Sequence, residues 1–327
     1  MPPRLTSWDG GERRVGVELE FAAVSAQAGA QLVQELFGGS IEEEDPHRYH
    51  IVETELGKFT SELDTQYAHR SYGEIDEVSD GSEPFAQFLI DFRDGIRRAY
   101  GNISSLVVPC EIVCPPIALR ILPELDSLVR KLTEAGAQGT RISPFYAFGA
   151  QFNPEIATRD PVRLTAVLKS YVLLSDWLRS VTIIDPTRRL VAFADPFPSD
   201  YVELVVAPEY WPGQDVLIED YVFFNPTRNR ELDMLPLFAW LAPDRLQQYI
   251  EDPRIKARPA FHYRLPDANL GVPGWTLILE WNRWVVVERL AQNPDTLDAM
   301  GIAYRENRAR ILPDDWALRA SEWLVLA

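Results

Sequence analysis

Residues 14–21 read Arg-Val-Gly-Val-Glu-Leu-Glu-Phe, an alternation of apolar and acidic side chains. A β-strand turns successive side chains to opposite faces of its sheet. The valines, Leu19 and Phe21 therefore share one face, while Glu18 and Glu20 share the other, about 7 Å apart. This stretch predicts a strand with one buried face and one acidic face.

The same pattern occurs in two further stretches. Residues 58–64 place Glu62 and Asp64 on one face of a second strand, and residues 110–114 add Glu111 on a third. If these strands are neighbours, five carboxylates converge on one face of a sheet. Like charges at such distances repel unless cations neutralise them. Because carboxylate oxygens are the ligands that hard divalent cations prefer, the sequence predicts a metal site.

Two later strands contribute polar groups of other kinds. Gln151 and Asn153 lie on the first, and His262 and Arg264 on the second. Oxygen ligands together with an arginine suit a complex of Mg²⁺ with phosphate. The alternative is that an antiparallel sheet merely shows polar residues to water. Such faces usually mix residue types, since like charges opposite each other destabilise a sheet, whereas the five acids here have one sign.

The other predicted elements alternate between helices and strands. Helices are expected over 26–37, 84–100, 122–135, 161–181, 230–240, 243–250, 275–291 and 316–326, with an acidic loop at 42–46 and a long loop over 185–220. This order favours an α+β fold with a mainly antiparallel sheet of about six strands. Helices would cover one face and the acidic face would stay open. Residues 12–266 are predicted to form the catalytic core, and residues 267–327 a helical segment packed on it in one continuous domain.

Composition narrows the class of protein. The 327-residue chain carries a net charge of −17, which argues against binding to nucleic acid. It shows no signal peptide and no apolar run of about 18 residues, so no association with a membrane is expected. Only two cysteines are present, and they fit a reducing compartment. A cytoplasmic location is therefore predicted, while no feature of the sequence indicates an oligomeric state.

Two of these stretches carry a family resemblance. Residues 14–21 resemble the first-strand G-x-E-x-E-F signature of the amidoligases, which belong with glutamine synthetase and glutamate–cysteine ligase among the carboxylate–amine ligases. Residues 111–116 resemble that family's E-[IL]-V-S-P-P motif, with Cys114 where Ser is usual. Looser likenesses follow at 148–153 and 261–264, so the resemblance covers about residues 14–265.

In the looser stretches the chain departs from the family pattern. Gln151 and Asn153 stand where the family has the histidines of an H-V-H-V-G-like strand. His262 stands near the glutamate of an E-F-R element, whose arginine is kept as Arg264.

The resemblance implies a fold like the glutamine synthetase catalytic domain and a reaction that uses ATP and Mg²⁺ (or Mn²⁺). ATP would phosphorylate a carboxylate of a small molecule or peptide, and an amine would attack the acyl phosphate to give an amide. The resemblance implies that the metal is bound by Glu18, Glu20, Glu62 and Glu111. It implies that catalysis depends on Glu18, Glu20, Asp64 and Arg264, with Asp64 as a further metal ligand or as the base on the amine side. Contacts to the nucleotide, to phosphate or to metal-bound water are implied for Gln151, Asn153, His262, Arg228 and Arg230.

Two rival functions stay open. A metal-dependent hydrolase could use the same carboxylates to activate water. The other is a catalytically inactive binding protein of the same fold, because Gln151 and His262 depart from the family pattern. Arg228 and Arg230 could equally be solvated arginines at the start of a helix.

Overall fold

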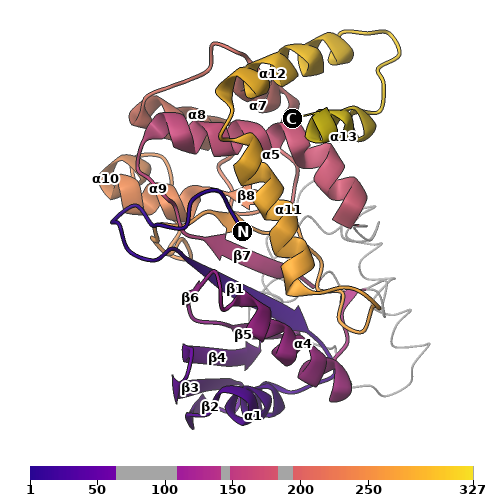
Figure 1. Cartoon of the computed structure of the whole chain (residues 1–327). Coiled ribbons are helices and arrows are strands. Elements are labelled where there is room, and N and C mark those ends of the chain that lie inside the picture. Colours follow the sequence, from indigo (N-terminus) through magenta and orange to yellow (C-terminus); the bar gives the residue numbers. More distant parts are fainter. Residues whose placement is uncertain (64–108, 141–147, 183–193, 327) are drawn as a thin grey trace, which may run out of the picture.

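Strand β1 (Arg14–Phe21) lies inside one antiparallel sheet (Figure 1). The computed structural model describes residues 1–63, 109–140, 148–182 and 194–326. Within these residues the sheet has nine strands, so the expected number of about six was too low. Their order is β2 (Ser40–Asp45), β3 (Arg48–Thr54), β4 (Gly57–Leu63), β5 (Cys110–Val113), β1, β7 (Ala150–Pro154), β9 (His262–Tyr263) and β8 (Leu232–Asp233), with β6 (Ile117–Ala118) beside β1.

The alternation in β1 produces the predicted division between two faces. Val15, Val17, Leu19 and Phe21 are at most 1% exposed and belong to the hydrophobic core. The same face of the neighbouring strands adds further large apolar side chains, among them Phe59, Ile112 and Phe152. Burial of this face is the main stabilising contribution to the sheet.

Helices cover the apolar face in two groups (Figure 1). The first packs near β3, β4 and β5 and consists of α1 (Ala26–Phe37) and α4 (Leu125–Glu134), the latter preceded by the 3₁₀ turn Leu122–Glu124. Ser25 begins α1, because its side-chain oxygen accepts a hydrogen bond from the N–H of Ala28 at 3.2 Å. The long helix α11 (Leu277–Leu290) contacts both α4 and α5 (Pro161–Thr182), and so links the two groups.

The second group surrounds α5 beyond β7, β8 and β9. It contains α7 (Ser199–Val206), α8 (Gln214–Phe224), α12 (Pro294–Arg308) and α13 (Trp316–Leu326), with the short helices α9 (Leu235–Leu241) and α10 (Pro243–Leu246) nearby. Tyr171 of α5 packs against Tyr263 of β9 with ring centroids 5.9 Å apart. The sheet and the helices therefore share one continuous core.

Three local predictions were wrong. The acidic residues 42–45 are part of β2 and not of a loop, residues 185–220 contain α7 and the start of α8, and residues 232–233 form β8 instead of a helix. The predicted helix over 84–100 lies outside the described residues. Tertiary pairing explains the strands, because β2 pairs with β3 and β8 with β9.

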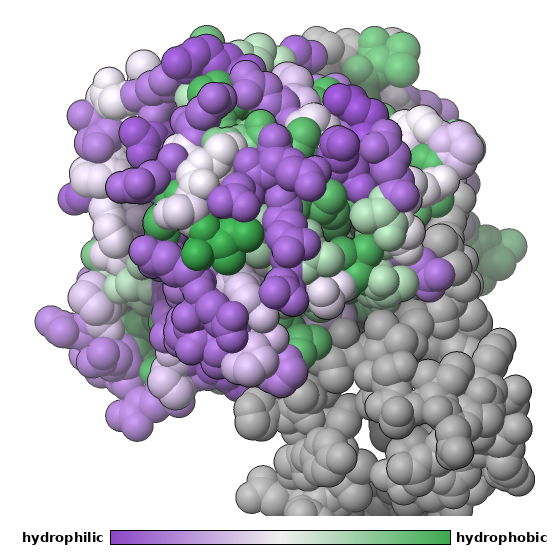
Figure 2. Space-filling model, turned by 90° about the horizontal axis from the view of Figure 1, so that it is seen from below, coloured by the Kyte–Doolittle hydropathy of each residue, from purple (hydrophilic) through white to green (hydrophobic). Residues whose placement is uncertain are grey.

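The acidic edge strand is well suited to its position. Residues 42–45 are exposed, and Figure 2, which views the molecule from below, shows mainly hydrophilic residues at this end. Charged side chains on an edge strand oppose its pairing with another sheet. In the described part of the chain, no helix is long and apolar enough to span a membrane.

The two cysteines allow a test of this packing. Cys110 and Cys114 are both buried and unpaired, and burial raises the pKa of the Cys110 thiol to about 11 and that of Cys114 further still. Since the thiolate is the reactive form, neither residue should react with Ellman's reagent in the folded protein, and both should react in guanidinium chloride. Rapid reaction of either thiol without denaturant would contradict the packing of β5.

Candidate active site

A row of charged side chains crosses four adjacent strands on the face of the sheet opposite the core. Glu20 of β1 is directly opposite Glu111 of β5, Glu111 is opposite Glu62 of β4, and Glu62 is opposite Arg48 of β3. Directly opposed residues of antiparallel strands have Cα atoms about 4.5–5.5 Å apart. Arg48 forms an ion pair with Glu62 and so offsets part of the repulsion at one end of the row. The register thus brings three of the five predicted carboxylates side by side.

Glu20 is the anchor of the row. Its side chain is 6% exposed, and its two oxygens accept hydrogen bonds from the N–H of Gly149 at 2.8 Å and from the side-chain amide of Gln151 at 2.7 Å. An ionised carboxylate can only accept hydrogen bonds, so the Gln151 NH₂ group must face Glu20. The carbonyl oxygen of Gln151 consequently points the other way, towards β9.

The side chain of His262 forms a hydrogen bond with this oxygen. Its Nε2 lies 2.8 Å from Oε1 of Gln151, and its Nδ1 lies 3.4 Å from Oδ2 of Asp233 on β8. Burial lowers the pKa of the imidazole well below its ordinary value; Glu18 opposes this shift, while Arg258 adds to it. His262 is therefore neutral near pH 7, with its proton on Nε2 where it can be donated to Gln151.

Asp233 closes the polar row. It is fully buried, and burial raises its pKa to about 6, against the opposing effects of Arg264 and of the Leu235 N–H that it accepts at 2.9 Å. Hydrogen bonds thus link His262 of β9 through Gln151 of β7 to Glu20 of β1, and Asp233 of β8 lies beside the imidazole nitrogen that carries no proton in this tautomer. Because each side chain orients the next, these groups form a fixed hydrogen-bonded network and are not independently solvated.

Glu18 lies beside this hydrogen-bonded network, with its Oε2 3.8 Å from Nε2 of His262. Its Oε1 accepts a hydrogen bond from Asn153 at 2.8 Å, and Asn153 in turn accepts one from Arg258 at 2.6 Å. Burial acts to raise the pKa of Glu18, but His262 when protonated, the charge of Arg258 and the amide of Asn153 outweigh it, so that the pKa is lowered. Glu18 therefore stays ionised, and a carboxylate with a lowered pKa is a weak base.

Three arginines occupy the β9 end of this face. Arg264 donates a hydrogen bond to the backbone carbonyl of Arg228, and the charges of Arg228, Arg258 and Arg264 all act on Asp233. Arg228 is half-buried, yet its guanidinium makes no hydrogen bond or ion pair with any described residue. Burial also lowers its pKa, so holding the charge there is costly. The charges of Asp233 and Asp252 offset part of this cost, and the guanidinium has no hydrogen-bond acceptor among the described residues, so it could bind an added anion.

The face is suited to a cation at its other end. Glu20, Glu62 and Glu111 supply oxygen ligands on adjacent strands, which is the donor chemistry of Mg²⁺. Among the described residues, however, no three His, Cys, Asp or Glu side chains are gathered closely enough to hold an ion. Glu20 and Glu62 are instead engaged with donors of the protein. The donor set fits, and binding would require these carboxylates to exchange protein donors for the metal.

The structure places the other predicted residues as follows. Asp64 lies outside the described residues. Arg230 donates to the carbonyl oxygens of Pro196 at 2.7 Å and Phe224 at 3.5 Å, so it binds the end of α8 and not the carboxylates. Gln151, Asn153, His262 and Arg264 lie together with Glu18 and Glu20, as the alternation indicated.

Two residues of the site were missed. Asp233 lies in an alternating stretch, Glu231-Leu232-Asp233-Met234, which could have been identified as a strand. Arg258 precedes β9 by four residues and lies in no regular element, so only the tertiary structure shows that it reaches Asn153.

Comparison with known proteins gives one result. The model of a family described as "putative amidoligase enzyme" matches residues 11–286, which include β1, β5, β7, β9 and all the site residues above. Neither a curated protein nor a solved structure matches the chain. The likeness to the glutamine synthetase catalytic domain therefore stays a prediction.

The role of Glu20 as anchor can be tested by stability. Glu20→Gln keeps the shape but replaces one acceptor oxygen by a donor, so Gly149 or Gln151 loses its partner in a buried site. We expect the free energy of unfolding to fall by about 1–3 kcal/mol in urea titrations. Glu62→Gln is the matched control; its ion pair with Arg48 is partly exposed, so the loss should be below about 1 kcal/mol. If both variants lost the same free energy of unfolding, Glu20 would not have the structural role described above.

Proposed function

The chain belongs to the amidoligase family, and we propose that it is an ATP-dependent carboxylate–amine ligase that forms an amide bond through an acyl phosphate. The observation that carries the proposal is the division of one sheet face into two halves. Carboxylates line the β4–β5–β1 half, and three arginines lie at the β9 end, one of them without a partner in the described structure. A nucleotide triphosphate with a divalent cation has the complementary arrangement of charge.

The arginines would act on the phosphates. Arg228 and Arg258 would bind phosphate oxygens in the ground state, since guanidinium groups match them geometrically. Arg264, held by the carbonyl of Arg228, would offset negative charge on the γ-phosphoryl group as it moves to the substrate carboxylate. The bond from the γ-phosphorus to the bridging oxygen breaks, ADP leaves, and the new bond to the carboxylate oxygen gives the acyl phosphate.

The carboxylates would hold the cation. Glu20, Glu62 and Glu111 are the ligands proposed from their shared row, and Glu18 is a further one. When bound, Mg²⁺ would neutralise charge on the phosphates that the acids otherwise repel. Gln151 and Asn153 would donate hydrogen bonds to the nucleotide or to water, and the neutral His262 would keep Gln151 in the required orientation.

The second half-reaction needs a base. The amine attacks the acyl carbon, inorganic phosphate leaves, and one proton of the amine must be removed. The lowered pKa of Glu18 makes it a poor base, and its charge is better suited to electrostatic stabilisation of the attacking ammonium-like nitrogen. Asp64, two residues beyond Glu62, remains our candidate for the base.

Calorimetry tests the cation-dependent part of the proposal. ATP should bind in the presence of Mg²⁺ and lose at least about tenfold in affinity in EDTA, because unneutralised carboxylates repel the triphosphate. Glu111→Gln should weaken binding with Mg²⁺, whereas Glu134→Gln, which removes one exposed charge from the helix-covered side, should not. Equal binding with and without Mg²⁺ would contradict the model, and turnover of a substrate without nucleotide would favour the hydrolase.

A pair of arginine variants tests the anion-binding part. Arg228→Gln should weaken ATP binding about tenfold and leave the melting temperature unchanged or raised, since its guanidinium makes no hydrogen bond or ion pair with a described residue. Arg230→Gln should do the reverse, lowering the melting temperature without changing ATP affinity, because its guanidinium binds two backbone carbonyls. Titration calorimetry and thermal unfolding of both variants separate the two roles.

A further inference from the structure

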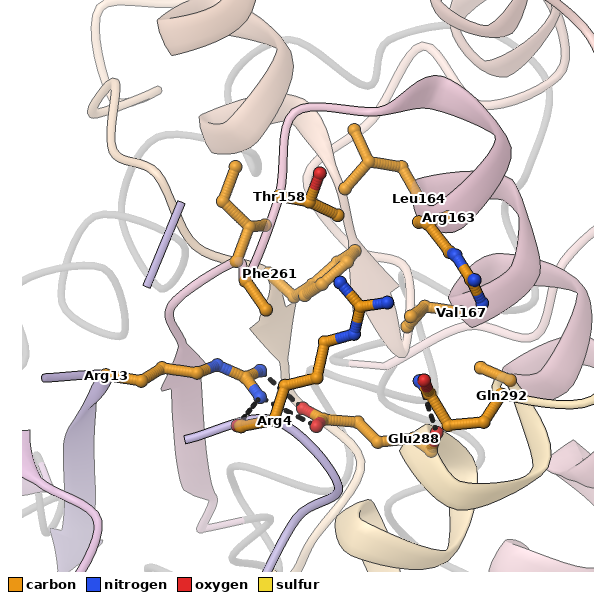
Figure 3. A pocket seen from close by; sticks show the side chains of 12 residues that line it. Arg4, Arg13, Thr158, Arg163, Leu164, Val167, Phe261, Glu288 and Gln292 are labelled. Carbon is orange, nitrogen blue, oxygen red and sulfur yellow. Dashed lines mark hydrogen bonds and ion pairs between the residues drawn. The ribbon is translucent and has the colours of Figure 1, made fainter. Parts of the chain in front are cut away.

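A hollow lies on the helix-covered side of the sheet (Figure 3). It is formed where the segment before β1, the connection from β7 to α5, the first turns of α5 and the end of α11 meet. Phe261 lines it, whereas the next residue, His262, points to the opposite face and into the candidate active site. The two sites are therefore separated by the sheet itself.

Positive charge predominates in this hollow. It is lined by Arg4, Arg13 and Arg163 against a single acid, Glu288. Arg13 is 2% exposed and binds both oxygens of Glu288, at 2.7 and 2.5 Å, and Trp284 donates a further hydrogen bond to the same carboxylate at 2.6 Å. Glu288 is thus neutralised within the protein, which leaves the charges of the other two arginines.

Arg4 and Arg163 have no acidic partner in the described residues, although the protein carries 49 acidic residues to 32 basic ones. In the view of Figure 3, Val167 lies between their two guanidinium groups. Both side chains are partly buried, so each has given up part of its hydration. Two like charges that share a hollow repel each other, and an anion bound between them would relieve this repulsion.

The rest of the lining is apolar. Ile156, Leu164, Val167, Phe261 and Ala291 form most of it, and the polar contribution beyond the charged groups comes from Thr158 and Gln292. The hollow has a cavity volume of only about 40 Å³ and is open to solvent, so a bound molecule would lie partly outside it. Its lining has the composition of small-molecule sites, which are mostly apolar with a few convergent polar groups.

We propose that this hollow binds a small organic carboxylate with an apolar body, its carboxylate held by Arg4 and Arg163 and its apolar part against Phe261 and Leu164. Guanidinium groups match the two oxygens of a carboxylate, and the apolar lining gains from excluding water. A fully hydrated inorganic anion would use only half of the site. The site is distinct from the ATP-binding face, and the inference does not depend on the proposed function.

Equilibrium dialysis of the full chain with labelled benzoate tests the site in the absence of ATP and Mg²⁺. Benzoate should bind saturably, butyrate should displace it, and benzyl alcohol, acetate and phosphate should displace it at least about tenfold less well. The doubly substituted Arg4→Gln, Arg163→Gln protein should bind benzoate at least about tenfold more weakly. Val167→Phe, which fills the hollow and keeps both arginines, should weaken binding similarly.

Arg289→Gln is the matched control, because it removes one exposed arginine next to Glu288 that does not line the hollow. It should leave benzoate affinity unchanged, and far-ultraviolet circular dichroism should show that every variant is folded. The proposal is overturned if wild type shows no saturable binding, if the double variant binds as well as wild type, or if phosphate competes as well as butyrate. Binding of Mg²⁺–ATP by the double variant should equal that of wild type, so failure of the two proposals can be told apart.

Discussion

The carboxylate of Glu20 is the constraint on which the polar face depends. It lies on an inner strand, almost buried, and its two oxygens hold the N–H of Gly149 and the amide of Gln151. Because a carboxylate accepts and never donates, it sets the orientation of Gln151, and through it the proton position on His262. One acidic side chain thus determines the chemistry of two neighbouring strands.

The second constraint is charge balance across the same face. Three glutamates in one row would destabilise the sheet if nothing compensated them. Arg48 compensates at the β3 end, and Arg264 and Arg258 act on Glu18 from the β9 end. Within the described residues, Glu20 and Glu62 also bind donors of the protein.

The period-two pattern predicted much of this arrangement because it is a local property of the chain. Alternation alone placed Glu18 and Glu20 on one face of a strand and Glu62 on one face of another, whereas the order β4–β5–β1 that brings them together depends on tertiary pairing. Nothing local predicted that Asp233 would pair with β9, or that Arg258 would cross a loop to reach Asn153. The same limit explains β2, whose acidic residues have low strand propensity and become a strand only by pairing with β3.

The two departures from the family pattern are coupled in space. The resemblance implies a histidine on the strand of Gln151 and a glutamate near the position of His262, and each departure alone would remove a functional group. In the structure these two side chains are hydrogen-bonded at 2.8 Å, so an imidazole is still present, supplied by β9 instead of β7. The carboxylate near that end is likewise supplied by a neighbouring strand, as Asp233 of β8 lies 3.4 Å from the imidazole. This end of the face therefore carries both an imidazole and a carboxylate, each on the strand next to the one that the resemblance indicates.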